Sequence, residues 1–286
     1  MDIVNKIDLH THTAFSDGSL TPAQLVASAY EAGLRVVAIT DHDTVDGAEE
    51  ALDEAGRLQR GFILVPGVEI SSDDSRPLHI LGYFNSKNYT NITPLLRDME
   101  RERDVRNHAI IDRLNKLGIR VTSDDVEAIA GKKIYGRAHI ASALVKAGIS
   151  ESIDAAFRVY LSEGRKAFVN KRSLPAEECV AAIAGAGGLP VVAHPGLYGL
   201  KLSELTGLVK KLSAYGLYGV EAYYPEHAPK ETENYVLAAR RLNLSVTGGS
   251  DFHGEYRKHI RLGTGRNGNL RVPDGVAEEL LKALNY

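Results

Sequence analysis

Short runs of β-branched and aliphatic residues recur along the chain, and most of them precede a longer stretch in which apolar residues return every three or four positions. The apolar runs are IDLH, RVVAIT, FILVPGVEI, LHILGYF, LPVVAH, YGVEAYY and LSVTGG. Continuously apolar strands that alternate with amphipathic helices are typical of a parallel sheet covered by helices. About seven such strands favour a barrel-like β/α fold over a small open sheet.

Helix boundaries support this interpretation near the N-terminus. Thr21 precedes Pro22, a pairing that predicts an N-cap followed by a favoured first helical residue. Gly33 stands where a left-handed residue would end the same helix.

The alternation stops between residues 83 and 189. Residues 92–117 predict one long charged helix, and residues 123–162 predict two or three shorter helices without strands between them. We therefore expect an inserted helical lobe at residues 101–171, which divides the barrel into residues 1–100 and 172–286. Insertions of this kind accumulate at one mouth of a β/α barrel, which is the place expected for this lobe.

Composition and charge narrow the functional classes. The chain has 286 residues, of which 44% are hydrophobic and 25% are charged, as in an ordinary globular protein. A formal net charge of −3 gives no basic footprint for duplex DNA. The one cysteine, Cys179, fits the buried stripe of a helix and excludes an intrachain disulfide. With no signal peptide and no membrane-spanning run in view, we expect a cytoplasmic protein.

Histidines and carboxylates gather where the predicted strands end. In a β/α barrel these positions meet at one rim, where such folds place their chemistry. His10 and His12 stand at positions i and i+2, so both side chains can point to one side of the chain. Six of the ten histidines lie at such positions. The candidates are His10, His12, Asp17, Asp41, His42, Glu69, His79, His194, Asp251 and His253.

This set of side chains indicates a metal centre. Imidazole and carboxylate ligands without thiolate suit Zn²⁺, Mn²⁺ or Fe²⁺. The candidates exceed what one ion can use, so two or three clustered ions are implied, and Glu69 is the natural bridge between them. Asp41 or Asp43 could orient the imidazoles by hydrogen bonding. The histidines outside this set and outside the helical lobe's YGRAHIA segment are expected on the surface: His108, His227 and His259.

The segment YGRAHIASAL offers a second candidate site. Arg137 and His139 stand at the start of a predicted helix, where backbone N–H groups and a guanidinium could converge on an anion. The alternative is structural, with Arg137 as an ordinary salt-bridge partner and His139 as a helix-start residue.

Six segments closely resemble, in sequence and in order, the motifs of the PHP (polymerase and histidinol phosphatase) superfamily. They are HTHTAFSDG, ITDHDT, GVEIS, HILGY, AHPG and GSDFH. The resemblance implies an α/β fold, a distorted seven-stranded (β/α) barrel of PHP type with a small inserted helical lobe, and a three-metal centre at the strand ends. The lobe, with YGRAHIA and FRVYLSEGRKAFVNK, resembles the branch that hydrolyses nucleoside 3′,5′-bisphosphates such as pAp. Members release the 3′-phosphate and leave a nucleoside 5′-monophosphate, and relatives trim short RNA from its 5′ end.

The resemblance also implies roles for individual residues. Three divalent ions are expected, with Mn²⁺ ahead of Fe²⁺ or Zn²⁺, and Arg137, His139 and Lys171 would hold a second phosphate or an RNA 5′-phosphate. Relatives often carry a Tyr-Val-Pro segment where this chain has AFVNKR, which leaves the roles of Lys171 and Arg172 open. The implied ligands are His10, His12, Glu69 and Asp251 for the first ion, Glu69, His79 and His194 for the second, and Asp17, His42 and His253 for the third.

The expected reaction is metal-assisted hydrolysis of a phosphomonoester, which requires no serine or cysteine nucleophile. The expected partners are a small nucleotide bisphosphate and short RNA 5′ ends, not duplex DNA or a membrane, and the net charge favours the small molecule. Two alternatives remain open. One is a histidinol-phosphate phosphatase of the same superfamily, and the other is a non-catalytic metal-binding PHP module.

Overall fold

The computed structural model describes residues 6–58, 61–72, 78–130, 136–170 and 174–286. The chain divides into two compact units, which are described separately. The barrel unit comprises residues 1–95 and 174–286, and the helical unit comprises residues 96–173. None of the helices in the described ranges is both long enough and apolar enough to cross a membrane.

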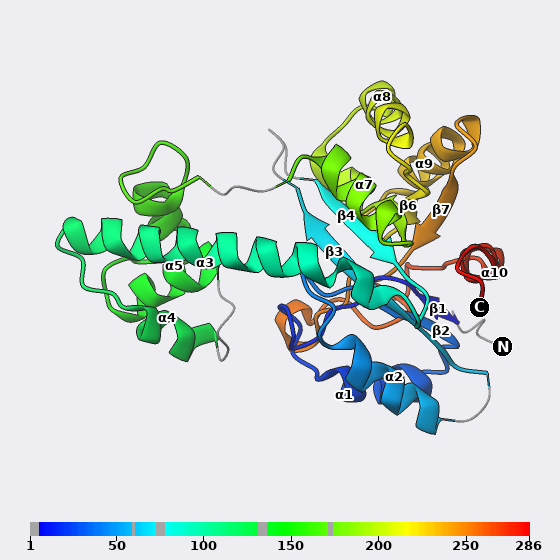
Figure 1. Ribbon diagram of the computed structural model, residues 1–286, viewed down its shortest axis with the longest axis horizontal. Coiled ribbons are helices and arrows are strands. Elements are labelled where there is room, and N and C mark those ends of the chain that lie inside the picture. Colours follow the sequence, from blue (N-terminus) through cyan, green and yellow to red (C-terminus); the bar gives the residue numbers. More distant parts are fainter. Residues whose placement is uncertain (1–5, 59–60, 73–77, 131–135, 171–173) are drawn as a thin grey trace. The chain divides into compact units, whose positions relative to one another are not determined.

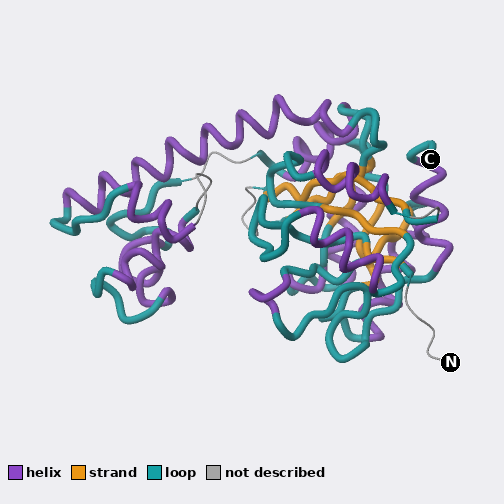
Figure 2. Tube along the Cα trace, turned by 90° about the horizontal axis from the view of Figure 1, so that it is seen from below, coloured by secondary structure: helices purple, strands orange, loops and turns teal. Residues whose placement is uncertain are grey.

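The barrel unit is built around one sheet of seven strands, which neighbour each other in chain order. The strands lie at the centre of the unit with helices around them (Figures 1 and 2). Past the last strand, Thr11 and Phe252 form a parallel bridge, which brings the end of the sheet back to its beginning. The predicted seven-stranded barrel is therefore confirmed. Its strands are β1 (Ile7–Asp8), β2 (Val36–Ile39), β3 (Ile63–Ser71), β4 (His79–Tyr83), β5 (Leu189–Val192), β6 (Gly219–Tyr223) and β7 (Ser245–Gly248).

One strand departs from the expected all-parallel sheet. β4 runs antiparallel to both β3 and β5, with Ser71 paired to His79 and Ile80 to Val192. The reason is the short connection of residues 72–78, since a parallel pair needs a crossover of a dozen or more residues. Because β4 runs in the opposite direction, its first residue, His79, lies at the rim where the parallel strands end.

Helices cover the outside of the sheet in the barrel unit (Figure 1). The helix predicted after Thr21 is present: the Thr21 hydroxyl accepts from the Gln24 N–H at 3.2 Å, and Gly33 follows the helix with φ of +80°. The helices are α1 (Pro22–Glu31), α2 (Ala48–Arg57), α7 (Ala176–Gly185), α8 (Leu202–Ser213), α9 (Pro229–Arg241) and α10 (Asp274–Ala283), with 3₁₀ turns η1 (Tyr89–Ile92), η3 (Pro195–Tyr198) and η4 (Gly254–Arg257).

Alternate residues of the strands enter two different apolar clusters. In β2, Val36 packs with Leu81 and Leu280, whereas its neighbour Val37 packs with Leu25 of α1. Burial on both faces explains why the strands are apolar throughout and do not alternate with polar residues. As predicted, Cys179 is buried in a helix, α7.

The helical unit has an apolar core of its own. Leu114, Ile140, Leu144 and Leu161 are fully buried in it. No strand occurs in the described residues between β4 and β5, which confirms the predicted long helix and the shorter helices after it. The helices are α3 (Thr93–Lys116), α4 (Ser123–Ala130), α5 (Arg137–Lys146) and α6 (Ile153–Ala156), followed by a π-helical turn η2 (Phe157–Leu161).

Candidate metal centre

The structure brings together all nine side chains that the resemblance implies as ligands. They form four overlapping groups, and within each group one potential ligand atom per residue lies within 4.8 Å of the others. The groups are His12, Asp17, His42 and His253; His10, Glu69 and His194; His10, His12 and Asp251; and His42, Glu69 and His79.

His10 and His12 converge although β1 itself ends at Asp8. The chain stays extended past the strand because the His12 N–H donates to Phe252 O at 2.9 Å and Thr11 O accepts from the Thr40 N–H at 2.9 Å. The two imidazoles therefore point to the same side, and their Nε2 atoms lie 3.1 Å apart.

Glu69 lies at the middle of the cluster and is 1% exposed. Its Oε1 is 2.9 Å from both His79 Nδ1 and His194 Nε2. Its Oε2 is 3.2 to 3.3 Å from a ring nitrogen of each of His10, His12 and His42. The two oxygens thus face different groups of histidines, which is the geometry of a bridging carboxylate.

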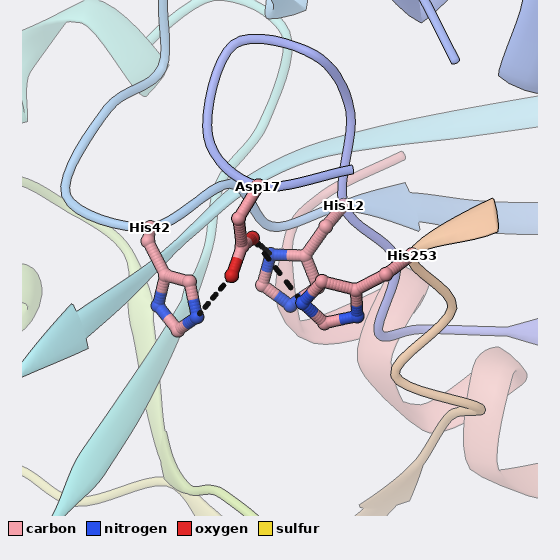
Figure 3. Close-up of side chains that lie close together, drawn as sticks. All are labelled: His12, Asp17, His42 and His253. Atoms are coloured by element: carbon pink, nitrogen blue, oxygen red, sulfur yellow. Dashed lines mark ion pairs between the residues drawn. The ribbon is translucent and has the colours of Figure 1, made fainter. Parts of the chain in front are cut away.

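The carboxylate of Asp17 lies close to the rings of three histidines, His12, His42 and His253 (Figure 3). One of its oxygens lies 3.2 Å from His253 Nε2 and 3.6 Å from His12 Nδ1, and the other lies 3.7 Å from His42 Nε2. The side chain of Asp17 is 49% exposed and that of His42 is 26% exposed, whereas that of His12 is fully buried. The cluster therefore opens to solvent on the side of Asp17 and His42.

The electrostatics of the cluster favour ionised carboxylates. Burial by itself would raise the pKa of Glu69, but His42 and His79 outweigh it and hold that pKa well below its usual range. Burial would also raise the pKa of Asp251, but His10 and His12 hold it well below its usual range. In return, Asp251 and Glu69 overcome the effect of burial and raise the pKa of His12 to about 10. Glu69, Asp251 and His12 thus stabilise one another's charged forms.

The donor atoms fit metal ions. Among the described residues of the cluster, the buried Nδ1 atom of His42, which faces Glu69, has no hydrogen-bond partner. His42 Nδ1 lies 3.2 Å from Glu69 Oε2 without hydrogen bonding to it. A buried nitrogen without a partner costs free energy unless another ligand takes its lone pair, and a divalent cation does so. Nitrogen and oxygen donors without thiolate are typical of Mn²⁺, Fe²⁺ and Zn²⁺ sites.

Backbone strain is concentrated at the same place. His194 has φ of +24°, Asp251 has +55° and Asp43, next to His42, has +53°. The remaining described non-glycine residues with positive φ are asparagines, and both asparagine and aspartate tolerate that region better than most residues. A residue held in such a conformation costs about 1–3 kcal/mol and persists where the surroundings require it. Here the unusual turn at His194 aims its imidazole towards Glu69, with Nε2 2.9 Å from Oε1.

Three residues at the centre were not identified from the sequence. Glu221 of β6 is fully buried and lies 2.9 Å from His10 Nδ1. A lone carboxylate within the apolar run YGVEAYY was the available signal. Tyr224 donates to Asp251 Oδ2 at 2.9 Å, and Arg257 pairs with the same oxygen. No motif in the sequence marked these two residues.

The expected role of Asp41 in orienting an imidazole is indirect, because its hydrogen bonds in the described residues come from the main chain and from hydroxyl groups. Asp41 accepts from the Thr13 N–H at 2.7 Å, the Thr13 hydroxyl at 2.6 Å and the Ser16 hydroxyl at 2.5 Å. Ser16 Oγ in turn lies 3.4 Å from His12 Nδ1, so Asp41 reaches an imidazole only through a hydroxyl. Asp43 accepts from the Ser71 N–H at 3.1 Å.

The surface assignment is confirmed for two histidines and wrong for the third. His108 and His259 are exposed. His227, however, is 8% exposed, and its ring packs against Tyr224 and Tyr235. Its Nδ1 donates to Ala222 O at 3.0 Å, and its Nε2 accepts from a backbone N–H at 3.1 Å. The prediction was wrong because it used only the polar neighbours of His227 in the sequence, whereas the ring is buried by the aromatic rings of Tyr224 and Tyr235.

The candidates for anion binding lie in the helical unit. The Arg137 guanidinium is 5.9 Å from the ring centre of Phe157 and 5.8 Å from that of Phe168. His139 Nδ1 accepts from the Gly136 N–H at 3.2 Å, so His139 caps the start of α5. Lys171, the third candidate, and its neighbour Arg172 lie outside the described residues.

Comparisons with known proteins show the family of this chain. The PHP domain profile matches residues 8–171. The chain is 34% identical over 252 residues to a 5′-3′ exoribonuclease of Haemophilus influenzae, covering 88% of this chain and 91% of that protein. It is 32% identical over 249 residues to a 3′,5′-nucleoside bisphosphate phosphatase of Chromobacterium violaceum, covering 86% and 87%.

A solved structure extends the similarity to three dimensions. The crystal structure of a candidate metal-dependent phosphoesterase of Bifidobacterium adolescentis superposes with a TM-score of 0.76 at 34% identity. The match covers 96% of this chain and 95% of that one. With its barrel, its nine-residue cluster and these relatives, the chain belongs to the PHP domain family.

Proposed function

We propose that this protein is a metal-dependent phosphoesterase that removes the 3′-phosphate from nucleoside 3′,5′-bisphosphates such as pAp. The products are a nucleoside 5′-monophosphate and phosphate. Trimming of short 5′-phosphorylated RNA is proposed as a related activity, since relatives carry both names. The observation that carries the proposal is the cluster of nine ligand-type side chains around the buried Glu69.

Three divalent ions are proposed, with Mn²⁺ ahead of Fe²⁺ or Zn²⁺. His12 Nε2 lies 3.2 Å from Asp251 Oδ1, which supports placing both at the first ion. When bound, such ions polarise a phosphate ester and lower the pKa of a water molecule. The proposed ligands are His10, His12, Glu69 and Asp251 for the first ion, Glu69, His79 and His194 for the second, and Asp17, His42 and His253 for the third.

The exposure of the side chains indicates which of them face the substrate. His10, His12 and Glu69 are buried, so they hold ions and do not contact a nucleotide. Asp17, His42 and His79 are partly exposed, at 49%, 26% and 29%, and form the open side of the cluster. A substrate phosphate would approach on that side, where solvent already reaches the ligands.

The helical unit would supply substrate binding. Arg137 is proposed to hold the second phosphate, together with His139 and Lys171. Contacts with Phe157 and Phe168 restrict the guanidinium, which lowers the entropy lost when an anion binds. The partner is then a small nucleotide or a short RNA 5′ end, not duplex DNA, and a nucleotide substrate fits a cytoplasmic location.

The direct test measures phosphate release from pAp and from histidinol phosphate, and nucleoside 5′-monophosphate release from a short 5′-phosphorylated RNA, with Mn²⁺ present and bound metal quantified in parallel. We expect the fastest release from pAp, with AMP as the product. Fastest release from histidinol phosphate would favour that phosphatase instead. Bound metal with no release from any of the three would favour a non-catalytic module.

Metal removal gives an independent test. Chelation should abolish phosphate release, and added Mn²⁺ should restore it. Full activity in the chelated protein would contradict the metal-dependent mechanism. Asp17→Asn, on the open side of the cluster, should lower kcat strongly with the fold intact, because an amide is a weaker ligand than a carboxylate.

A further inference from the structure

Glu221 is a carboxylate within the barrel that none of the family motifs includes. It is fully buried, and its two oxygens have different partners. Oε1 lies 2.9 Å from His10 Nδ1, and Oε2 accepts from the backbone N–H of His194 at 2.7 Å. One side chain therefore contacts two of the nine proposed ligands, which share one group with Glu69 and which the proposed ligand sets assign to different ions.

The contact with His10 defines which ring nitrogen can bind a metal. An ionised carboxylate only accepts hydrogen bonds, so His10 Nδ1 must carry the proton. In a neutral imidazole, the form that binds metal, the lone pair then lies on Nε2, which is 3.3 Å from Glu69 Oε2 and 3.6 Å from Asp251 Oδ1. Glu221 thus presents the correct nitrogen of His10 to the centre of the cluster.

The contact with His194 restrains a strained turn. His194 has φ of +24°, a conformation that L-residues rarely adopt. The hydrogen bond from its N–H to Glu221 fixes the main chain at that residue. The direction of the imidazole towards Glu69 depends on this main-chain conformation, since its Nε2 reaches Oε1 at 2.9 Å.

The neighbouring histidine has a weaker support of the same kind. The Ser16 hydroxyl donates to Asp41 and can accept from His12 Nδ1, but at the longer distance of 3.4 Å. His12 is therefore oriented indirectly, through a hydroxyl. His10 depends on the direct contact with Glu221, which makes Glu221 the stronger of the two supports.

We propose that Glu221 is a positioning residue that holds His10 in its metal-binding tautomer and holds the main chain of His194 through the same carboxylate. This inference rests on the proposed function, because it assumes that the cluster binds metal. It predicts that the loss of one buried carboxylate, itself not a ligand, weakens binding at two ions together.

Glu221→Gln tests the acceptor role with little change in shape. Both partners of the side chain are N–H donors, and glutamine offers only one acceptor oxygen and one donor NH₂. If the amide oxygen faces His10, the NH₂ group meets the N–H of His194, and the reverse orientation is no better. In either case one of the two histidines loses its support.

Asp8→Asn provides a matched control. Asp8 is also fully buried, and it accepts from Ser250 and from the Gly263 N–H at 2.6 to 2.8 Å. Apart from a longer contact of 3.4 Å with the main-chain N–H of His10, it reaches no proposed ligand in the hydrogen bonds that the structure defines. The control therefore removes a buried acceptor without removing the support of an imidazole.

The experiment compares Mn²⁺ binding to the metal-free wild type, Glu221→Gln and Asp8→Asn by calorimetry, with bound metal counted. Glu221→Gln should weaken Mn²⁺ binding about 10- to 100-fold, as expected for loss of a hydrogen bond to a metal-bound histidine. Asp8→Asn should keep the wild-type affinity. In the Zn²⁺-loaded protein, NMR should show a protected His10 Nδ1–H, which is identified by its absence in His10→Gln. In Glu221→Gln, either this signal or the protection of the His194 main-chain N–H should be lost.

Several outcomes would overturn the inference. Wild-type Mn²⁺ affinity together with a retained Nδ1–H signal in Glu221→Gln would overturn it. A loss of affinity in Asp8→Asn as large as that in Glu221→Gln would also overturn it. If Glu221→Gln does not fold, Glu221→Asp is measured instead, and unchanged affinity there overturns it. No Mn²⁺ binding by the wild type would overturn the proposed function as well, whereas normal wild-type binding with an unaffected Glu221→Gln overturns this inference alone.

Discussion

The barrel unit and the helical unit carry opposite charge. The helical unit, residues 96–173, has 16 lysines and arginines against 11 aspartates and glutamates, a net charge of +5. The rest of the chain has 18 against 26, a net charge of −8. The whole-chain value of −3 hides this division. An acidic unit suits bound cations and a basic unit suits an anionic substrate, so charge is informative here only for each unit separately.

The two units also differ in what they bury. The barrel unit buries many ionisable groups, among them Asp8, Glu69, Glu221 and His10, whereas Arg106 is the buried charged residue among those described in the helical unit. Buried charges are costly unless they are paired or bind metal. The helical unit thus has an ordinary apolar core, while the barrel interior is organised around the cluster. Changes in the barrel should therefore affect metal binding and kcat, and changes in the helical unit should affect KM.

The largest effect is expected for Glu69→Gln. Glu69 lies within 3.3 Å of a ring nitrogen of five histidines, and glutamine leaves no carboxylate to bridge two ions. Loss of metal-based stabilisation worth several kcal/mol should lower kcat by about 1,000-fold or more. Steady-state kinetics with bound metal counted would check this. A near-normal kcat with full metal content would show that Glu69 is not a metal ligand.

The next effect should come from the helical unit and act on KM. Arg137→Ala removes a proposed charged hydrogen bond worth about 1.5–3 kcal/mol, which corresponds to a rise in KM for pAp of about 10- to 100-fold. Bound metal should stay at the wild-type level, because Arg137 belongs to the other unit. Kinetics at saturating Mn²⁺ would measure both quantities.

Two variants control for this result. Arg158→Ala removes an exposed arginine of the same unit and should leave KM near the wild-type value. Arg137→Lys keeps the charge but loses the planar group that lies near Phe157 and Phe168, so it should raise KM less than alanine does. An unchanged KM in Arg137→Ala would assign this residue a structural role. It would also contradict the expectation that changes in the helical unit affect KM.

The sequence predicted most of the centre because its ligands follow strands and fall in short motifs. His79 shows the limit of that reasoning: it begins its strand, and it joins the rim only because β4 runs antiparallel. Glu221 and His227 show another limit. Their roles depend on partners far along the chain, His10 for the first and Tyr235 for the second, and such pairings appear only once the barrel has closed.

A smaller effect is expected at His227, which lies in the barrel unit but outside the nine ligands. Burial lowers its pKa below the usual value, so the unfolded chain takes up a proton first as the pH falls. The stability due to neutral His227 is therefore complete above about pH 6.5 and is lost as the pH falls from there through the lowered pKa. His227→Gln should cost about 1–3 kcal/mol at neutral pH and reduce this acid dependence.

Unfolding by urea at pH 7 and pH 5 would measure the effect of His227→Gln, with Mn²⁺ stoichiometry as a second readout. Metal binding should be unchanged, because His227 contacts the main chain of Ala222 and Gly196 and no ligand side chain by hydrogen bond among the described residues. An identical pH dependence in variant and wild type would show that the buried ring does not titrate on unfolding.

The smallest effect should be the salt dependence of KM, and it compares the two substrates of the proposed function. For single-stranded nucleic acid, each phosphate contact contributes about 0.7 to the slope of log affinity against log salt, so raising salt from about 50 to about 200 mM should raise KM about threefold per contact. Short RNA has more phosphates than pAp and should show the steeper slope if the basic helical unit binds the substrate. Arg137→Ala should lower that slope by about 0.7 if Arg137 contacts one phosphate. Equal slopes for RNA and pAp would mean that the positive charge of the helical unit does not act on the substrate.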